Sequence, residues 1–368
     1  MLTIIICFFV LIVLAAIVLT LLVRSRNMQF WIRTYIYNAF SAKVKSPVKH
    51  VYFCLVDHYE PYYGDATEEE ARKLVDDWVT NYPEIAKLHS DSDGNPPQHS
   101  YFYPIEEYDK HILDQLSRIC KSGYGDVDVH LHHDNDTAEN LRTVLTEFKH
   151  TLFDDHQLLR KNKQGDIVYG FIHGNWALDN SRPDGRWCGV DNELDILVET
   201  GCAYDMTMPS APSDTQTKTI NSIYYAKEDG CAKSHDTGRN LVHGLTSQEE
   251  NEILMIQGPL TLNWQNRKLG LIPKIESGEL SGDLPPDISR TKLWVNCAVA
   301  VEGKEEHIFV KVHTHGLQHK NMEMFFEKNG FDDLWSSLES LYRDRDGCKL
   351  HYVSAWEMYE KIKQLESR

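Results

Sequence analysis

Short apolar segments alternate with longer amphipathic segments along most of this chain, and this alternation restricts the fold more than any other feature. The apolar segments with the length of buried strands are 51–56, 99–103, 127–131, 167–172, 203–208, 293–301 and 307–312. The segments with helical periodicity are 67–88, 106–121, one that starts at Asp136 or Thr137, 192–200, 319–343 and 354–366. Because strands alternate with helices, we predict an α/β fold, an irregular (β/α) barrel of about seven strands.

Ahead of this region, residues 2–23 carry no charge and are almost wholly apolar, which is the length needed to span a bilayer core. A secretory signal peptide would begin with a basic region and end at a small-residue cleavage site, and neither is present. We therefore predict a transmembrane anchor over 1–23, a basic linker over 24–48 and one large domain over 49–368. Since the basic residues follow the anchor, the positive-inside rule predicts a cytoplasmic domain on a bacterial-type inner membrane.

The charge of the chain and its missing motifs exclude several functions. The formal net charge of −17 argues against nucleic acid as a partner. The sequence has no Cys-x-x-Cys pair, no Gly-rich nucleotide motif and no Gly-x-Ser-x-Gly. A thiolate zinc finger, a nucleotide enzyme and a serine hydrolase therefore have no local support.

Residues able to bind a metal follow four of the predicted strands, at 57–58, 130–136, 173–176 and 313–315. In α/β folds the site collects at the carboxyl ends of the strands. His130 and His132 lie on one strand face, and Asp134 follows His130 by four residues. Imidazole and carboxylate ligands suit zinc, iron, nickel, cobalt or manganese. We predict a divalent-metal site at His130, with His132 or Asp134 as its partner.

The other strand-end residues suggest roles around that metal. Asp57 could bind the metal or take a proton from the attacking water, and His313 or His315 could protonate a leaving group. Asn175 and Trp176 are expected to contact substrate, the amide through hydrogen bonds and the indole against a sugar face.

The order of these motifs resembles the polysaccharide deacetylase superfamily of (β/α)-barrel proteins. That family has an Asp-Asp motif, an aromatic strand, a metal-binding His-x-x-x-His motif, an Arg-Pro-Pro-Tyr motif and a late Leu-x-His motif. The matching segments here are 55–58, 99–103, 130–134, 171–175 and 310–313. The likeness is one of motif order over most of residues 50–366.

The resemblance implies hydrolysis of an N-acetyl group on an amino sugar of a cell-envelope or lipid-linked saccharide. It implies a divalent metal, most simply zinc, on His130, Asp134 and Asp57, with Asp57 as base and His313 as acid, and it leaves His132, which shares the strand face of His130, as the rival of Asp134. The residues left for substrate binding are His58, His133, His173, Asn175, Trp176 and His315. The chain departs from the family pattern where His58 replaces the second aspartate, Asp134 the second histidine and His173 the arginine.

Two alternatives remain open. Residues 57–61 loosely resemble the His-x-His-x-Pro motif of some retaining glycoside hydrolases on a related barrel, although that chemistry needs a second carboxylate. A degenerate barrel could also bind carbohydrate, or help to assemble it, without turnover.

Overall fold

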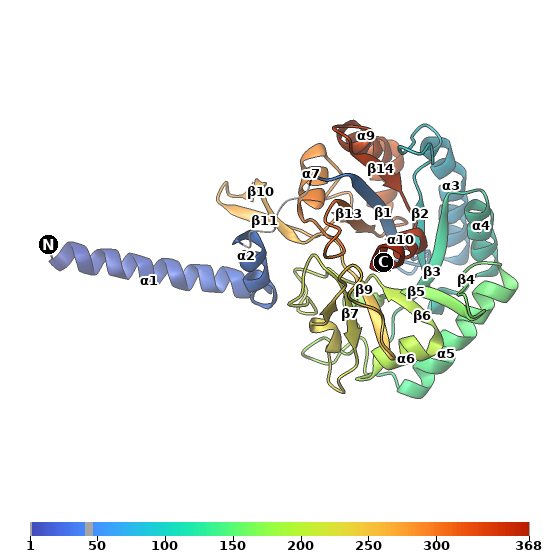
Figure 1. The fold of residues 1–368 in the computed structure, drawn as a ribbon, viewed down its shortest axis with the longest axis horizontal. Coiled ribbons are helices and arrows are strands. Elements are labelled where there is room, and N and C mark those ends of the chain that lie inside the picture. The colour runs from blue at the N-terminus through green and yellow to red at the C-terminus, as the bar shows by residue number, and fades with distance from the viewer. Residues whose placement is uncertain (1, 41–46, 368) are drawn as a thin grey trace.

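The computed structural model describes residues 2–40 and 47–367 and centres on a strongly curved, largely parallel sheet (Figure 1). Within these residues the main sheet has 12 strands, rather than about seven. Its central run is parallel, in the order β13 (His307–Thr314), β1 (His50–His58), β2 (His99–Pro104), β3 (Gly125–Leu131), β5 (Ile167–His173), β6 (Cys202–Asp205) and β9 (Glu252–Ile256). The predicted parallel α/β core is confirmed.

Short strands extend this run and account for the higher strand count. They are β4 (Arg160–Lys161), β7 (Ile223–Lys227), β8 (Arg239–Asn240), β12 (Glu279–Leu280) and β14 (Lys349–Tyr352). β7 and β8 form an antiparallel edge beyond β9, while β12 pairs with β13 at the opposite edge. The strand order does not close on itself within the described residues, so the sheet is an open barrel.

Most of the helices cover the outer face of the sheet. They are α3 (Glu68–Ala86), α4 (Lys110–Lys121), α5 (Ala138–His150), α6 (Glu193–Thr200), α7 (Ile288–Asn296), α8 (His319–Met322) and α9 (Gly330–Tyr342). The start of α3 follows its sequence signal, because the Thr67 side chain caps the helix and Glu70 completes the capping box. Apolar side chains of these helices and of one face of each strand form the larger core.

The inner face of the sheet is filled by the last helix, α10 (Ala355–Glu366), which lies near the middle of the molecule in Figure 1. Ala355, Met358 and Ile362 of α10 pack against alternate residues of the strands, such as Tyr52 and Val56 of β1. Successive side chains on a strand point to opposite faces. His58 therefore faces inward with Val56, whereas Asp57 faces the outer helices.

One predicted strand is wrong. Residues 293–301 were expected to be extended, but Ile288–Asn296 is a helix that Asp287 caps by accepting from the backbone of Ser289 and Arg290. The apolar run 293–301 includes both the end of this helix and the extended segment after it. Because both parts are apolar, composition alone did not indicate where the helix ends. The predicted helix over 319–343 is interrupted between α8 and α9, which starts at Gly330.

The N-terminal helix α1 (Leu2–Arg24) projects away from the domain and is long and apolar enough to cross a membrane (Figure 1). The segment after it packs on the domain: Met28 and Trp31 are buried against Leu260 and Leu262. A short helix, α2 (Ile32–Phe40), follows. Part of the predicted linker, residues 41–46, lies outside the described residues. The hairpin of β10 (Thr261–Lys268) and β11 (Ile272–Glu276) adjoins this segment.

Candidate functional site

Four histidines gather around one carboxylate at the carboxyl ends of β1, β3 and β13. Glu60 Oε1 lies 3.3 Å from Nε2 of His130, 3.3 Å from Nε2 of His132 and 4.0 Å from Nε2 of His315. The ring of His58 completes the group, with its centroid 4.8 Å from that of His130 and 4.6 Å from that of His315. We call these five residues the mouth cluster.

Two imidazoles of the mouth cluster, those of His130 and His132, are oriented by oxygen atoms behind them. His130 Nδ1 lies 2.7 Å from the carbonyl oxygen of Ile172, and His132 Nδ1 lies 2.5 Å from Glu106 Oε1. Since these oxygens only accept, each Nδ1 donates its hydrogen and each Nε2 is turned toward Glu60. Imidazoles that bind metals are commonly held in this way. Because the Nε2 lone pairs and the carboxylate of Glu60 repel one another, a proton or a cation must lie between them.

The electrostatics of the mouth cluster favour an ionised Glu60. Burial raises the pKa of Glu60, but its hydrogen bonds with His130 and His132 outweigh burial and hold that pKa well below the usual range. Burial lowers the pKa of His132, but the carboxylates of Glu106 and Glu60 reverse the shift and raise it to about 10. At neutral pH His132 therefore holds the proton that neutralises Glu60, and a divalent metal bound at these nitrogen and oxygen atoms would replace that proton.

Whereas His130 is fully buried behind Glu60, the four other residues of the mouth cluster, His58, Glu60, His132 and His315, line a cavity of about 370 Å³. Its other lining residues include Tyr62, Glu107, Asn175, Trp176 and Gln318. Asn175 and Trp176 both have a positive φ of 54°, an unusual conformation for residues other than glycine. Such backbone strain is typical of binding sites, where it fixes a side chain in a required position. Both predicted substrate contacts therefore lie at the cavity.

Glu107 is a second carboxylate on the cavity wall that sequence reasoning missed. Its Oε2 accepts a hydrogen bond from the backbone N–H of Tyr62 at 2.9 Å. Burial raises the pKa of Glu107 to about 7, and the negative charges of Glu60 and Glu106 add to this effect. The cavity thus holds one carboxylate that stays ionised and another that can carry a proton near neutral pH.

Asp57 is not part of the mouth cluster. Its carboxylate faces the outer helices, where Oδ2 lies 2.9 Å from His99 Nε2 and Oδ1 accepts the N–H of Gly316 at 2.7 Å. Both Asp57 and His99 are fully buried. Asp57 and His58 are neighbours on β1, so their side chains point to opposite faces of the sheet. Asp57, the predicted base and metal ligand, therefore lies on the face away from the cavity.

Asp134 also lies apart from His130. Its Oδ1 accepts the backbone N–H groups of Trp187 and Asn135, at 2.6 Å and 3.1 Å, and stabilises a loop. The partner that the structure brings to His130 is therefore His132. His313 lies on the inner face behind His58, with ring centroids 6.2 Å apart, and its buried Nδ1 has no hydrogen-bond partner among the described residues.

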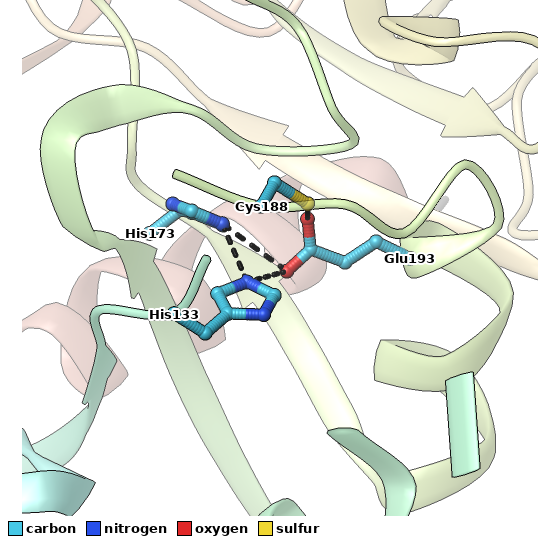
Figure 2. Close-up of side chains that lie close together, drawn as sticks. All are labelled: His133, His173, Cys188 and Glu193. Atoms are coloured by element: carbon cyan, nitrogen blue, oxygen red, sulfur yellow. Dashed lines mark hydrogen bonds and ion pairs between the residues drawn. The ribbon is translucent and has the colours of Figure 1, made fainter. Parts of the chain in front are cut away.

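His133 and His173 face the outer side of the sheet, away from the cavity. They meet Cys188 and Glu193 in a second, buried group (Figure 2). The strand-end rule predicted both histidines to be site residues and assigned them to substrate. Cys188 and Glu193 were missed because they lie in a loop and at the start of α6.

Comparisons with known proteins add little to this description. No protein-family model and no curated protein matches the chain. A solved structure of 4-alpha-glucanotransferase from Thermococcus litoralis is similar at 11% sequence identity and a TM-score of 0.42. The match covers 86% of this chain and 40% of that one. At this distance, the site is interpreted from the residues of the chain itself.

Proposed function

We propose that this protein is a metal-dependent hydrolase of carbohydrates, and that it removes the N-acetyl group of an amino sugar. The observation that carries the proposal is the convergence of His130 and His132 on Glu60, in a cavity that Glu60, His132 and Trp176 line. The nitrogens of the mouth cluster, with Glu60, are the residues that would hold a divalent cation. Such a cation supplies positive charge that polarises a carbonyl group and promotes the ionisation of water.

The remaining cavity residues fit the other needs of amide hydrolysis. Trp176 offers an aromatic face to the apolar side of a sugar ring, and Asn175 offers an amide for its hydroxyl or acetamido groups. Glu107, with a pKa of about 7, can accept a proton from water and return one to the leaving amine. This assignment moves the base from Asp57 to Glu107, because Glu107 lines the cavity and Asp57 does not.

A specific observation also favours glycoside hydrolysis as a second candidate. Glu60 and Glu107 line one cavity, and their pKa values are shifted in opposite directions. A pair of carboxylates with separated pKa values is what an acid and a nucleophile or base require. Glu107 would therefore supply the second carboxylate that glycoside hydrolysis requires and that sequence reasoning missed.

The two candidates differ in product and in metal dependence. The full chain, purified in detergent, is incubated with N-acetylated oligosaccharides, and both released acetate and new reducing ends are measured. We expect acetate release that a chelator abolishes, that added zinc restores, and that His132→Ala lowers by about 100-fold or more. His150→Ala, at an exposed histidine on α5, serves as the matched control.

Each alternative outcome contradicts the deacetylase. New reducing ends that survive the chelator and disappear in Glu107→Gln would establish the glycosidase. Saccharide binding without either product, under every divalent metal tried, would establish a binding protein.

A further inference from the structure

A second cluster of metal-binding residues lies outside the cavity, on the other side of the sheet. It comprises His133 after β3, His173 at the end of β5, Cys188 in the following loop and Glu193 at the start of α6 (Figure 2). Each residue offers one ligand atom, and the four atoms lie within 4.8 Å of one another. We call these four residues the lateral cluster.

The hydrogen bonds around the two imidazoles leave both Nε2 atoms pointing into the lateral cluster. His133 Nδ1 lies 2.9 Å from Asp136 Oδ2, and His173 Nδ1 lies 2.5 Å from the carbonyl oxygen of Gly174. With both Nδ1 hydrogens directed at oxygen atoms, the two Nε2 lone pairs face each other across 2.8 Å. Lone pairs at this separation repel unless a positive charge lies between them.

The carboxylate of Glu193 also requires a positive charge at this position. Its Oε1 lies 3.4 Å from His133 Nε2 and 3.6 Å from His173 Nε2, and it has no hydrogen-bond partner among the residues described. Its Oε2 accepts the backbone N–H of Asp179 at 2.6 Å and lies 3.4 Å from Cys188 Sγ. Glu193 is fully buried, where an oxygen without a partner is costly.

From this convergence we propose that the lateral cluster binds a structural zinc ion through His133 Nε2, His173 Nε2, Glu193 Oε1 and Cys188 Sγ. Zinc takes nitrogen, oxygen and sulfur ligands in a tetrahedron, with bond lengths that separate neighbouring ligand atoms by about 3.3–3.8 Å. The distances from Glu193 to the two histidines fall in this range, and the two Nε2 atoms, 2.8 Å apart, would separate by about 0.5 Å when the ion binds. Asp136 and the Gly174 carbonyl are the outer groups that fix the imidazoles.

The burial of the lateral cluster indicates a structural role rather than a catalytic one. His173, Cys188 and Glu193 are fully buried, and the side chain of His133 is 6% exposed. A closed set of four protein ligands leaves no position for substrate. The ion would join β3, β5 and α6 to the loop that begins with Asn175 and Trp176. The ion would therefore fix the wall of the cavity. This proposal does not depend on whether the mouth cluster is catalytic.

The test uses the thiolate ligand, which the mouth cluster lacks. The full chain in detergent is stripped of metal and titrated with Co²⁺, and the thiolate-to-cobalt charge-transfer absorption is recorded. We expect this absorption in the natural chain and in His132→Ala, and its loss in Cys188→Ala. Cys348→Ala, at a buried cysteine in the turn before β14, is the matched control and keeps the absorption. Glu193→Gln should keep it but need at least about 10-fold more cobalt.

The metal-free alternative is a protonated His133 that donates to His173 and Glu193. It predicts no thiolate absorption in the natural chain at any cobalt concentration, a result that does not depend on the folding of a variant. That result, or an absorption that persists in Cys188→Ala, would overturn the zinc site. Loss of acetate release in His132→Ala with the absorption intact would separate this inference from the proposed function.

A different observation carries a second inference, on the hairpin of β10 and β11. The hairpin projects on the same side of the domain as α1 (Figure 1) and exposes Trp264, Leu269 and Leu271 by 57%, 84% and 79%. The basic residues Arg267 and Lys268 precede its turn. Its base is fixed to the end of α1, because Leu262 and Ile275 pack with Trp31 and Val23.

We infer that this hairpin inserts into the surface of an anionic phospholipid bilayer beside α1. Tryptophan favours the membrane interface, leucine the hydrocarbon below it, and basic side chains attract anionic headgroups. Because the hairpin adjoins the end of a candidate membrane-spanning helix, insertion would hold the cavity at a fixed distance from the membrane.

Spin-labelled lipids test this contact directly. The full chain, with Cys7 and Cys231 changed to serine, is labelled with a fluorophore at Leu269→Cys and reconstituted in vesicles of phosphatidylglycerol and phosphatidylcholine. Lipid spin labels should quench the probe at position 269 but not at Leu245→Cys, an equally exposed leucine outside the hairpin. Equal quenching at the two positions would overturn the inference.

Discussion

At the scale of single residues, alternation along a strand decides which chemistry each side chain can reach. His130 and His132 point toward Glu60 and the cavity, whereas the neighbouring His133 points outward to Glu193. In the same way, His58 enters the mouth cluster and Asp57 is directed into the outer core. One run of residues, 130–133, thus supplies ligands to two separate clusters.

The outward position of Asp57 gives a prediction that separates a structural role from a catalytic one. Removing the carboxylate leaves the buried Gly316 N–H and His99 Nε2 without a partner, so Asp57→Ala should cost about 1–3 kcal/mol of unfolding free energy for each of them. Asp57→Asn should cost about 1–3 kcal/mol, because the amide can still accept the Gly316 N–H. Denaturant unfolding measures both. The metal content of folded Asp57→Asn should be unchanged, and loss of metal would return Asp57 to the site.

Gly174 provides a second residue-scale test. A Cβ at this position would lie 2.3 Å from Cδ2 of His132 and 2.7 Å from the carbonyl oxygen of Leu131. Gly174→Ala should therefore displace the His132 ring from Glu60 and weaken metal binding at the mouth cluster by about 10–100-fold. Calorimetric titration with Zn²⁺ measures the change, in a Cys188→Ala background because Gly174 also contacts His173 of the lateral cluster. His150→Ala, at an exposed histidine on α5, is the control; equal affinity in the two variants would argue against the mouth cluster.

At the scale of elements, the open barrel is bridged by a buried lysine. Lys311 on β13 donates from Nζ to the carbonyl oxygens of Met206 and Met208, both at 2.8 Å, and so links this strand to the segment after β6. Burial is the main cause that lowers the pKa of Lys311 from 10.5 to about 8, and Asp205 opposes it.

This shift predicts how stability depends on pH. Between about pH 8 and 10.5 the unfolded chain binds a proton at Lys311 that the folded chain does not, so this residue makes the folded state more stable as pH rises. Below pH 8 both states are protonated and the gain is absent. The unfolding free energy of the natural chain should rise across this window relative to Lys311→Met. Parallel pH profiles for the two proteins would contradict the account.

The elements also show why sequence reasoning succeeded in part. Segments such as 51–56 are apolar on both faces, as expected for a parallel sheet covered on both sides, so the strands could be located but their inward face could not. The strand-end rule therefore found His130, His132, His315, Asn175 and Trp176 together with the misdirected Asp57. Glu60 and Glu107 lie beyond the strand ends, in a turn and a short 3₁₀ helix, where only the tertiary structure brings them to the cavity.

At the scale of the whole molecule, the charges at the end of α1 predict the orientation of the domain. Met28 and Trp31 are buried on the domain, so Arg24, at the end of α1, and Arg26 lie where the helix joins the folded chain. These charges favour the cytoplasmic side. A reporter that is active only outside the cytoplasm, fused after Arg368, should be silent, while a cytoplasmic reporter at the same position should be active. The reverse pattern would place the domain outside the cytoplasm.

The central claim is that the mouth cluster binds a divalent metal. It is tested most directly by elemental analysis of the full chain, purified in detergent, beside His130→Ala and the control His150→Ala. We expect bound zinc or a similar metal in the natural chain and in His150→Ala, and about one equivalent less per chain in His130→Ala. Equal metal content in all three proteins, or a natural chain that binds no metal after incubation with zinc, would contradict the account.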